Sequence, residues 1–181
     1  MVTKAILIGF AQKKYYLGYH ADNRIRRESS SGGVCKTLII DSLKNGMVDG
    51  AYSLKCTDSF PFAQGEFYTR EHIPSFGDMP NSVYHSVMAC TEIDRIQPCK
   101  RLMLVGTACQ LRALNSIIKD KCDEVVRVCI FCKQQKTLDS TRFLAKMMGT
   151  SVPPNLKFRP RYRGDGWPGI VRVDGFEPAL E

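Results

Sequence analysis

The chain has 181 residues, of which 44% are hydrophobic and 24% charged, as in soluble globular proteins with one core of ordinary size. No apolar run approaches the roughly 18 residues that cross a bilayer, and the N-terminus lacks a signal peptide's cleavage segment, so a cytoplasmic protein without a membrane span is expected. The net charge of +8 permits a phosphate-rich partner, including nucleic acid, but does not require one.

The first half of the chain predicts a strand–loop–helix–turn–strand unit. Apolar and aromatic runs predict the two leading strands, and an apolar face followed by Asn45-Gly46 predicts a helix and its end. The expected elements are strands at 4–10 and 15–19, a turn at 21–23, a helix at 34–43 and a strand at 48–54.

The second half predicts further alternation of strands and helices after an irregular segment at 57–82 that holds one strand at 65–69. Expected next are a helix at 86–96, a buried strand at 101–105, a helix at 111–118, a strand at 125–131 and an amphipathic helix at 137–148. The predicted fold is therefore α/β, with a mixed sheet flanked by helices. We expect residues 1–152 to form the cofactor-binding domain and the irregular Arg/Gly/Pro-rich segment 153–181, a candidate truncated continuation, to pack on its site.

Two glycine-rich loops point to a ligand. The first contains Ser30, Ser31, Gly32 and Gly33 and opens a helix, where free backbone N–H groups attract anions. The alternative is that these serines only cap the helix.

The second loop runs from Arg163 through Gly164 to Gly169 and contains Trp167, the single tryptophan. It offers an aromatic face beside positive charge. Together, the two loops predict a site for a phosphorylated, partly aromatic cofactor. The alternative for Trp167 is a simple anchor that fixes the C-terminal segment to the core.

Eight cysteines in a chain without a secretory signal favour metal, cluster or redox roles over disulfides, although any single one can be a small buried residue. Cys109 is expected at a helix N-terminus, where its thiol pKa should be lowered, unless it merely fits a tight turn. In the C-x-x-C of Cys129 and Cys132, the two side chains of a strand would point to opposite faces, so Cys132 is the expected site residue and Cys129 a core residue. Cys109 and Cys132 each follow a strand, and so are expected to face one crevice.

Other chemistries lack their motifs. The three histidines share no metal-ligand spacing, and surface or core positions are expected for them. No G-x-S-x-G, Walker A or G-x-G-x-x-G sequence is present, which disfavours a hydrolase, a P-loop protein and an ordinary dinucleotide-binding domain.

Five segments in order resemble the coenzyme F420 hydrogenase/dehydrogenase beta-subunit family of iron–sulfur flavoproteins. Their order and spacing fit the family over residues 15–173, nearly the whole chain. The segments are Arg24 to Val34, with its Ser-Ser-Ser-Gly-Gly loop; Asn45 to Ala51, similar to x-G-x-V-D-G-A; Gly106 to Gln110, similar to G-T-P-C-Q with Ala108 in place of proline; Phe131 to Lys133; and Arg163 to Gly169, similar to R-G-x-G-W-P-G.

The resemblance implies an FAD-dependent oxidoreductase or electron-transfer domain that moves electrons between FAD, a [4Fe-4S] cluster and coenzyme F420 or a redox partner protein, with oligomerisation possible. It implies cofactor binding by Ser30, Ser31, Gly32, Gly33, Thr107, Arg163, Gly164 and Trp167, and cluster ligation by Cys109 and Cys132. No side chain is assigned as catalytic, because the flavin would carry the chemistry.

The chain also departs from the family pattern. Val83 stands where a G-S-K-Y segment has lysine, and an N-terminal ferredoxin-like cysteine array is absent. A four-ligand cluster needs two more cysteines, for which Cys35 and Cys90 are the candidates. The alternative function is a non-catalytic, basic nucleic-acid-binding module built on the Lys157–Arg172 segment, or a degenerate relative without cofactor.

Overall fold

A four-stranded mixed sheet forms the centre of the molecule, with strand order β4-β3-β5-β6. The computed structural model describes residues 7–10, 13–16, 18–59, 61–83, 85–132, 136–147, 160–163 and 170–173. Strand β3 pairs antiparallel with β4, and β5 pairs parallel with both β3 and β6. The strands are β3 (Gly50–Cys56), β4 (Ala63–Thr69), β5 (Cys99–Thr107) and β6 (Cys122–Ile130).

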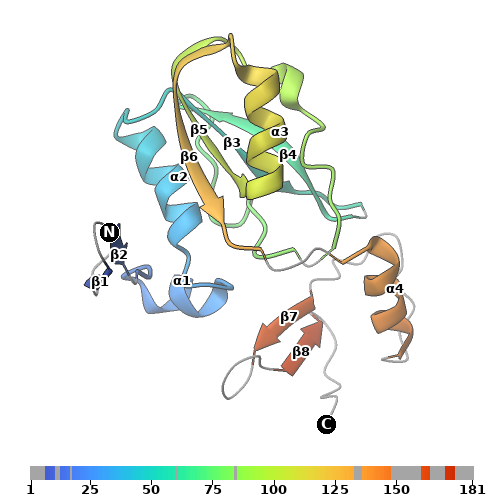
Figure 1. Cartoon of the computed structure of the whole chain (residues 1–181). Helices are drawn as coiled ribbons and strands as arrows, with labels where there is room; N and C mark the ends of the chain where they lie inside the picture. The colour runs from blue at the N-terminus through green and yellow to red at the C-terminus, as the bar shows by residue number, and fades with distance from the viewer. Residues whose placement is uncertain are drawn as a thin grey trace.

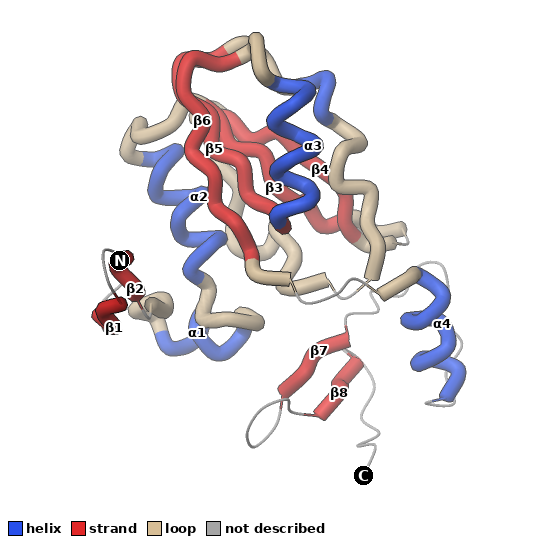
Figure 2. The backbone as a smooth tube through the Cα atoms, in the orientation of Figure 1, coloured by secondary structure: helices blue, strands red, loops and turns tan. Residues whose placement is uncertain are grey.

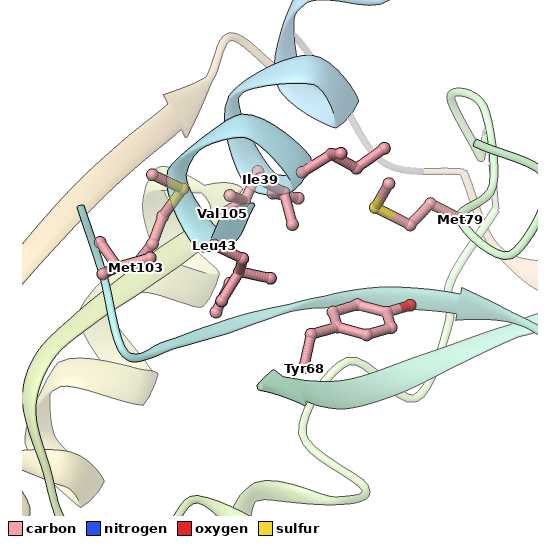
Figure 3. Close-up of a cluster of buried hydrophobic side chains, with 9 residues drawn as sticks. Ile39, Leu43, Tyr68, Met79, Met103 and Val105 are labelled. Atoms are coloured by element: carbon pink, nitrogen blue, oxygen red, sulfur yellow. The ribbon is translucent and has the colours of Figure 1, made fainter. Parts of the chain in front are cut away.

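One helix covers each face of this sheet (Figure 1). Helix α2 (Val34–Lys44) packs against one face and α3 (Ala108–Ile118) against the other. Figure 3 shows Ile39 and Leu43 of α2 together with Tyr68 of β4. The predicted α/β fold with a mixed, helix-flanked sheet is confirmed.

The middle of β5 is buried on both sides, and its residues alternate between the two cores. Met103 and Val105 join the α2 cluster, whereas Leu102 and Leu104 join the α3 cluster. All four are at most 7% exposed. A continuous apolar run is what a parallel strand covered by helices on both faces requires.

Smaller elements flank this unit. Strands β1 and β2 pair antiparallel, as do β7 and β8. No helix within the described ranges is both long and apolar enough to cross a membrane. These elements are β1 (Leu7–Phe10), β2 (Lys13–Tyr16), α1 (Asn23–Glu28), the 3₁₀ turn η1 (Ile93–Arg95), α4 (Leu138–Met147), β7 (Pro160–Arg163) and β8 (Ile170–Val173).

The prediction of a helix at 86–96 is wrong. Only residues 93–95 form a 3₁₀ turn, because the preceding backbone runs beside the outer edge of β4. The Gly65 N–H donates to the Met88 carbonyl at 2.9 Å, and the Tyr52 hydroxyl donates to the Ala89 carbonyl at 2.8 Å. Pairing with a sheet edge thus replaces the local hydrogen bonds that a helix would have made.

Two other elements differ from expectation. The chain bends at residues 21 and 22 as expected, but Asn23 then begins helix α1, because the Asp22 carboxylate accepts the Arg24 N–H at 2.7 Å and caps the helix. In the C-terminal segment expected to be irregular, β7 and β8 form a two-stranded ladder. The first residues of the strand expected at 4–10 lie outside the described residues.

Leu43 and Leu38 on α2 test how far the fold depends on the helix–sheet contact. Leu43 is fully buried, whereas Leu38 is 38% exposed. We expect Leu43→Ala to lower the free energy of unfolding by about 2–5 kcal/mol, because a cavity replaces packed side-chain atoms, and Leu38→Ala by less than about 1 kcal/mol. Urea denaturation measures both, and equal losses would contradict the packing described here.

Candidate functional site at the carboxyl edge of the parallel strands

The candidate site lies where the carboxyl ends of the parallel strands meet the N-terminal ends of α2 and α3 (Figure 2). The β3–β5 ladder ends at the Tyr52–Leu104 pair, while the β5–β6 ladder continues to the Thr107–Ile130 pair. After β3 the chain turns away to β4, and after β5 it passes through α3 to β6. Such a switch of direction between neighbouring strands is where open α/β sheets bind ligands.

The glycine loop before α2 has a backbone that other residues would strain. Gly32 and Gly33 have φ values of +74° and +81°, in the left-handed region. A Cβ on Gly32 would lie 3.0 Å from the Tyr19 Cβ, and one on Gly33 would lie 3.0 Å from the Ser29 Oγ. The turn itself therefore requires both glycines, whether or not a ligand approaches them.

The serines of this loop do not cap α2. Gly33 is the N-cap residue and makes no side-chain hydrogen bond to the helix. Buried Ser29 donates its hydroxyl to the Ile25 carbonyl of α1 at 2.7 Å, whereas Ser30 and Ser31 are exposed. The first N–H groups of α2 have no intrahelical acceptor, so the helix presents an anion-binding end beside two exposed hydroxyls.

A segment that the sequence analysis did not assign to the site contacts this helix end. The Lys36 ammonium, in the first turn of α2, donates to the Met79 carbonyl at 2.6 Å and to the Phe76 carbonyl at 3.0 Å. The Ser82 N–H donates to the Ser30 Oγ at 3.1 Å. Val83, which stands where the family pattern has lysine, directly follows Ser82 in the sequence. This neighbouring family motif was the one sequence signal that could have assigned Ser82 to the site.

Positive charge gathers beside the same loop. Arg24, Arg26 and Arg27 of α1 have exposed side chains. The Arg26 guanidinium lies 3.8 Å from the centre of the Tyr19 ring, a cation–π contact that holds it on this part of the surface. A helix N-terminus next to several arginines favours an anion.

Thr107 and Cys109 occupy the start of α3. Thr107 is its N-cap residue, and the Gln110 side chain accepts the Thr107 N–H at 2.9 Å. The Thr107 Oγ1 lies 3.1 Å from the Cys109 Sγ. This hydrogen bond, followed by the backbone N–H groups of Gln110 and Cys109, holds the pKa of the exposed Cys109 thiol below its ordinary value. The lowered pKa expected from the sequence is present.

Cys132 lies at the same edge of the sheet, just beyond β6. Thr107 and Ile130 are register partners at the ends of β5 and β6. Cys109 lies two positions after Thr107, and Cys132 lies two positions after Ile130. Cys132 is exposed and follows the fully exposed Phe131. Cys129 was expected in the core, but it is exposed, because β6 is the outer strand of the sheet.

The other candidate ligands do not complete a cluster. Cys35 packs against the α2 core and burial raises the pKa of its thiol, which opposes a thiolate role there. Cys90 is exposed in the segment beside β4. Within the part of the chain that the structure describes, no three or more His, Cys, Asp or Glu residues are grouped to hold a metal ion. These residues therefore do not supply the four thiolates of a [4Fe-4S] cluster.

The histidines take surface and core positions. His85 is 1% exposed, with Nε2 at 2.9 Å from the Pro61 carbonyl oxygen. His20 stacks edge-on against Phe76, and His72 is exposed. Neither a metal role nor a catalytic role is needed to explain them.

The second glycine loop cannot be placed in the site. Arg163 is the last residue of β7, whereas Gly164 and Trp167 lie outside the described residues. Their roles stay predictions.

Comparisons with known proteins bear on this site. Residues 15–72 match the family described as "Coenzyme F420 hydrogenase/dehydrogenase, beta subunit N-term". The resemblance to this family is confirmed. The matched residues include the serine–glycine loop but not Thr107, Cys109 or Cys132.

A solved structure shares the fold. It is one chain of a structure described as "Xenon derivatization of the F420-reducing [NiFe] hydrogenase complex from Methanosarcina barkeri", and it matches with a TM-score of 0.58 and 18% sequence identity. The match covers 71% of the present chain and 47% of that chain, so the protein spans about half the length of this relative. The search of curated proteins found no match.

The reactivity of Cys109 tests its local geometry. Thr107→Val removes the hydroxyl donor, so the pKa of the Cys109 thiol should rise and its alkylation at pH 7 should slow about two- to fivefold. Thr107→Ser keeps the hydroxyl and should behave like the unaltered chain. The tryptic peptide Leu102–Arg112 contains Cys109 as its single cysteine, so mass spectrometry can follow this thiol alone. Identical pH profiles in all three proteins would refute the assigned hydrogen bond.

Proposed function

We propose that this chain is a flavin-binding electron-transfer domain that binds the pyrophosphate of FAD at the N-terminus of α2. The observation that carries the proposal is the uncapped start of this helix, at the carboxyl edge of the parallel strands, beside exposed serine hydroxyls and the α1 arginines. The match of residues 15–72 to a redox family supports the same conclusion.

The helix end fits a diphosphate in charge and in hydrogen-bonding capacity. The N–H groups of its first turn, which have no acceptor within the helix, and the helix dipole attract an anion, and Ser30 and Ser31 add exposed hydroxyls. Because Gly32 and Gly33 carry no side chain, a phosphate can approach the backbone closely. Arg24, Arg26 and Arg27 supply the positive charge that offsets the two negative phosphate groups.

Bound flavin would supply the one- and two-electron redox chemistry, and the protein would bind and orient it. In this proposal, Thr107 contributes to cofactor binding from the start of α3, and Arg163, Gly164 and Trp167 flank the flavin. Residues 1–152 form the cofactor-binding domain, and residues 153–181 pack on its site.

Cys109 and Cys132 are proposed as thiolate groups at the same edge. The lowered pKa of Cys109 suits a metal ligand, since thiolates bind iron. Because the described residues assemble only part of a cluster's ligand set, we assign no electron-transfer step to a cluster here. Coenzyme F420 or a partner protein of a larger redox complex is the proposed electron partner.

A charge change at Ser31 separates flavin binding from folding. Ser31 is exposed and φ there is not positive, so substitution causes no backbone strain. Ser31→Asp places a carboxylate near the helix N-terminus, which favours the helix but repels a phosphate; Ser31→Asn is the neutral control of matching size. We expect Ser31→Asp to weaken FAD binding at least about tenfold relative to Ser31→Asn, with an equal or higher melting temperature.

Fluorescence titration of FAD measures this difference, with thermal unfolding recorded on the same samples. Equal FAD affinities in the two variants would show that the diphosphate does not bind at the start of α2. The substitution Gly33→Asp would not be informative, since a side chain at this positive φ strains the backbone and disrupts the loop whether or not FAD binds.

A further inference from the structure

Two cysteines lie together at the opposite edge of the sheet from the proposed cofactor site. Cys99 is the first residue of β5 and Cys122 is the first residue of β6. The two are register partners in the parallel ladder, and their Sγ atoms are 3.2 Å apart. Both residues are partly exposed and pack at the border of the α3 core, so neither is sealed inside it.

The backbone holds the two strand starts in place. The Cys99 N–H donates to the Lys121 carbonyl at 3.1 Å, and the Lys121 ammonium donates to the Ile96 carbonyl at 3.3 Å. The ladder then continues from this end to the Thr107–Ile130 pair. The two thiols are therefore held close by the fold and not by chance contact of mobile side chains.

We propose that Cys99 and Cys122 form a reversible redox-modification site that reacts with a low-molecular-weight disulfide of the glutathione class. A thiolate of the pair attacks the small disulfide, forms a mixed disulfide and releases one small thiolate. The second protein thiol, on losing its proton, displaces the other small thiol and closes the Cys99–Cys122 bond. Two protein thiols are oxidised to one disulfide, and one small disulfide is reduced to two thiols.

The surroundings of Cys99 slow the reaction of its thiol. Burial, followed by the hydrogen bond with Cys122, raises the pKa of the Cys99 thiol, so this group stays protonated near neutral pH. Modification is then slow, and its extent is set by the ratio of oxidised to reduced small thiol.

Closure of this bond would fix the whole β5–α3–β6 unit. The loop from Cys99 to Cys122 contains the strand and the helix start that position Thr107 and Cys109. A bond formed from native geometry constrains the unfolded chain more than the folded one. Folding and bond formation should therefore favour each other by the same factor.

The test uses the full chain, equilibrated without oxygen in a series of reduced and oxidised glutathione ratios and then alkylated. Trypsin releases Cys99 in the peptide Ile96–Lys100 and Cys122 in the peptide Cys122–Arg127, each with a single cysteine. Mass spectrometry then separates the linked pair from the two glutathione adducts. No flavin is needed, so the result is independent of the proposed function.

We expect the linked peptides to account for most of both cysteines at high oxidised glutathione and to separate again with dithiothreitol. The equilibrium constant for the link should be at least about tenfold larger in buffer than in denaturing urea, because only the fold holds the thiols together. Cys90→Ser, which removes an exposed cysteine elsewhere, should leave the link unchanged.

Cys122→Ser should leave only a glutathione adduct on Cys99. Glutathione adducts without a link in the unaltered chain, or equal constants in buffer and in urea, would overturn the proposal. The comparison of buffer with urea requires no variant, so it holds even if Cys122→Ser folds poorly.

Discussion

The parallel pairing of β5 with both neighbours is the constraint on which the rest of the structure depends. A strand in this position has no face exposed to water, so Leu102 to Val105 must be apolar and a helix must cover each side. Helices α2 and α3 satisfy this requirement with separate clusters of side chains. The order of elements then places the N-terminal ends of both helices at the carboxyl edge of the strands (Figure 1).

This arrangement gives the two edges of the sheet different chemistry. At the carboxyl edge, an uncapped helix start, exposed hydroxyls and arginines suit an anionic cofactor, and Thr107 lowers the pKa of the Cys109 thiol. At the amino edge, the Sγ atoms of the partly exposed residues Cys99 and Cys122 face each other. The first edge suits the proposed binding of an anionic cofactor. The second edge suits the proposed disulfide formation, whose extent would follow the ratio of oxidised to reduced small thiol.

Hydrophobic patterns predicted much of this fold because burial imposes them. The apolar run of β5 and the apolar face of α2 are direct consequences of packing, and both elements were predicted. Helix α1 was missed because it has mainly polar residues and is defined by its Asp22 cap. The helix expected at 86–96 failed because contact with β4, which local sequence does not encode, determines that backbone.

The site was predicted in part for similar reasons. Motif order indicated the glycine loop and Cys109, and both lie at the carboxyl edge, but the positive φ of Gly33 explains its glycine without any ligand. The contacts of Lys36 and Ser82 depend on tertiary structure and had no pattern of their own. The pairing of Cys99 with Cys122 follows from strand register, which periodicity alone does not fix.

The central claim is that the carboxyl edge binds a flavin. Its most direct test is the visible absorption spectrum of the chain purified without oxygen, incubated with FAD and separated from free cofactor, with iron and sulfide assayed on the same sample. We expect a two-banded flavin spectrum to stay with the protein if this claim holds. A folded but colourless protein after this treatment would contradict it.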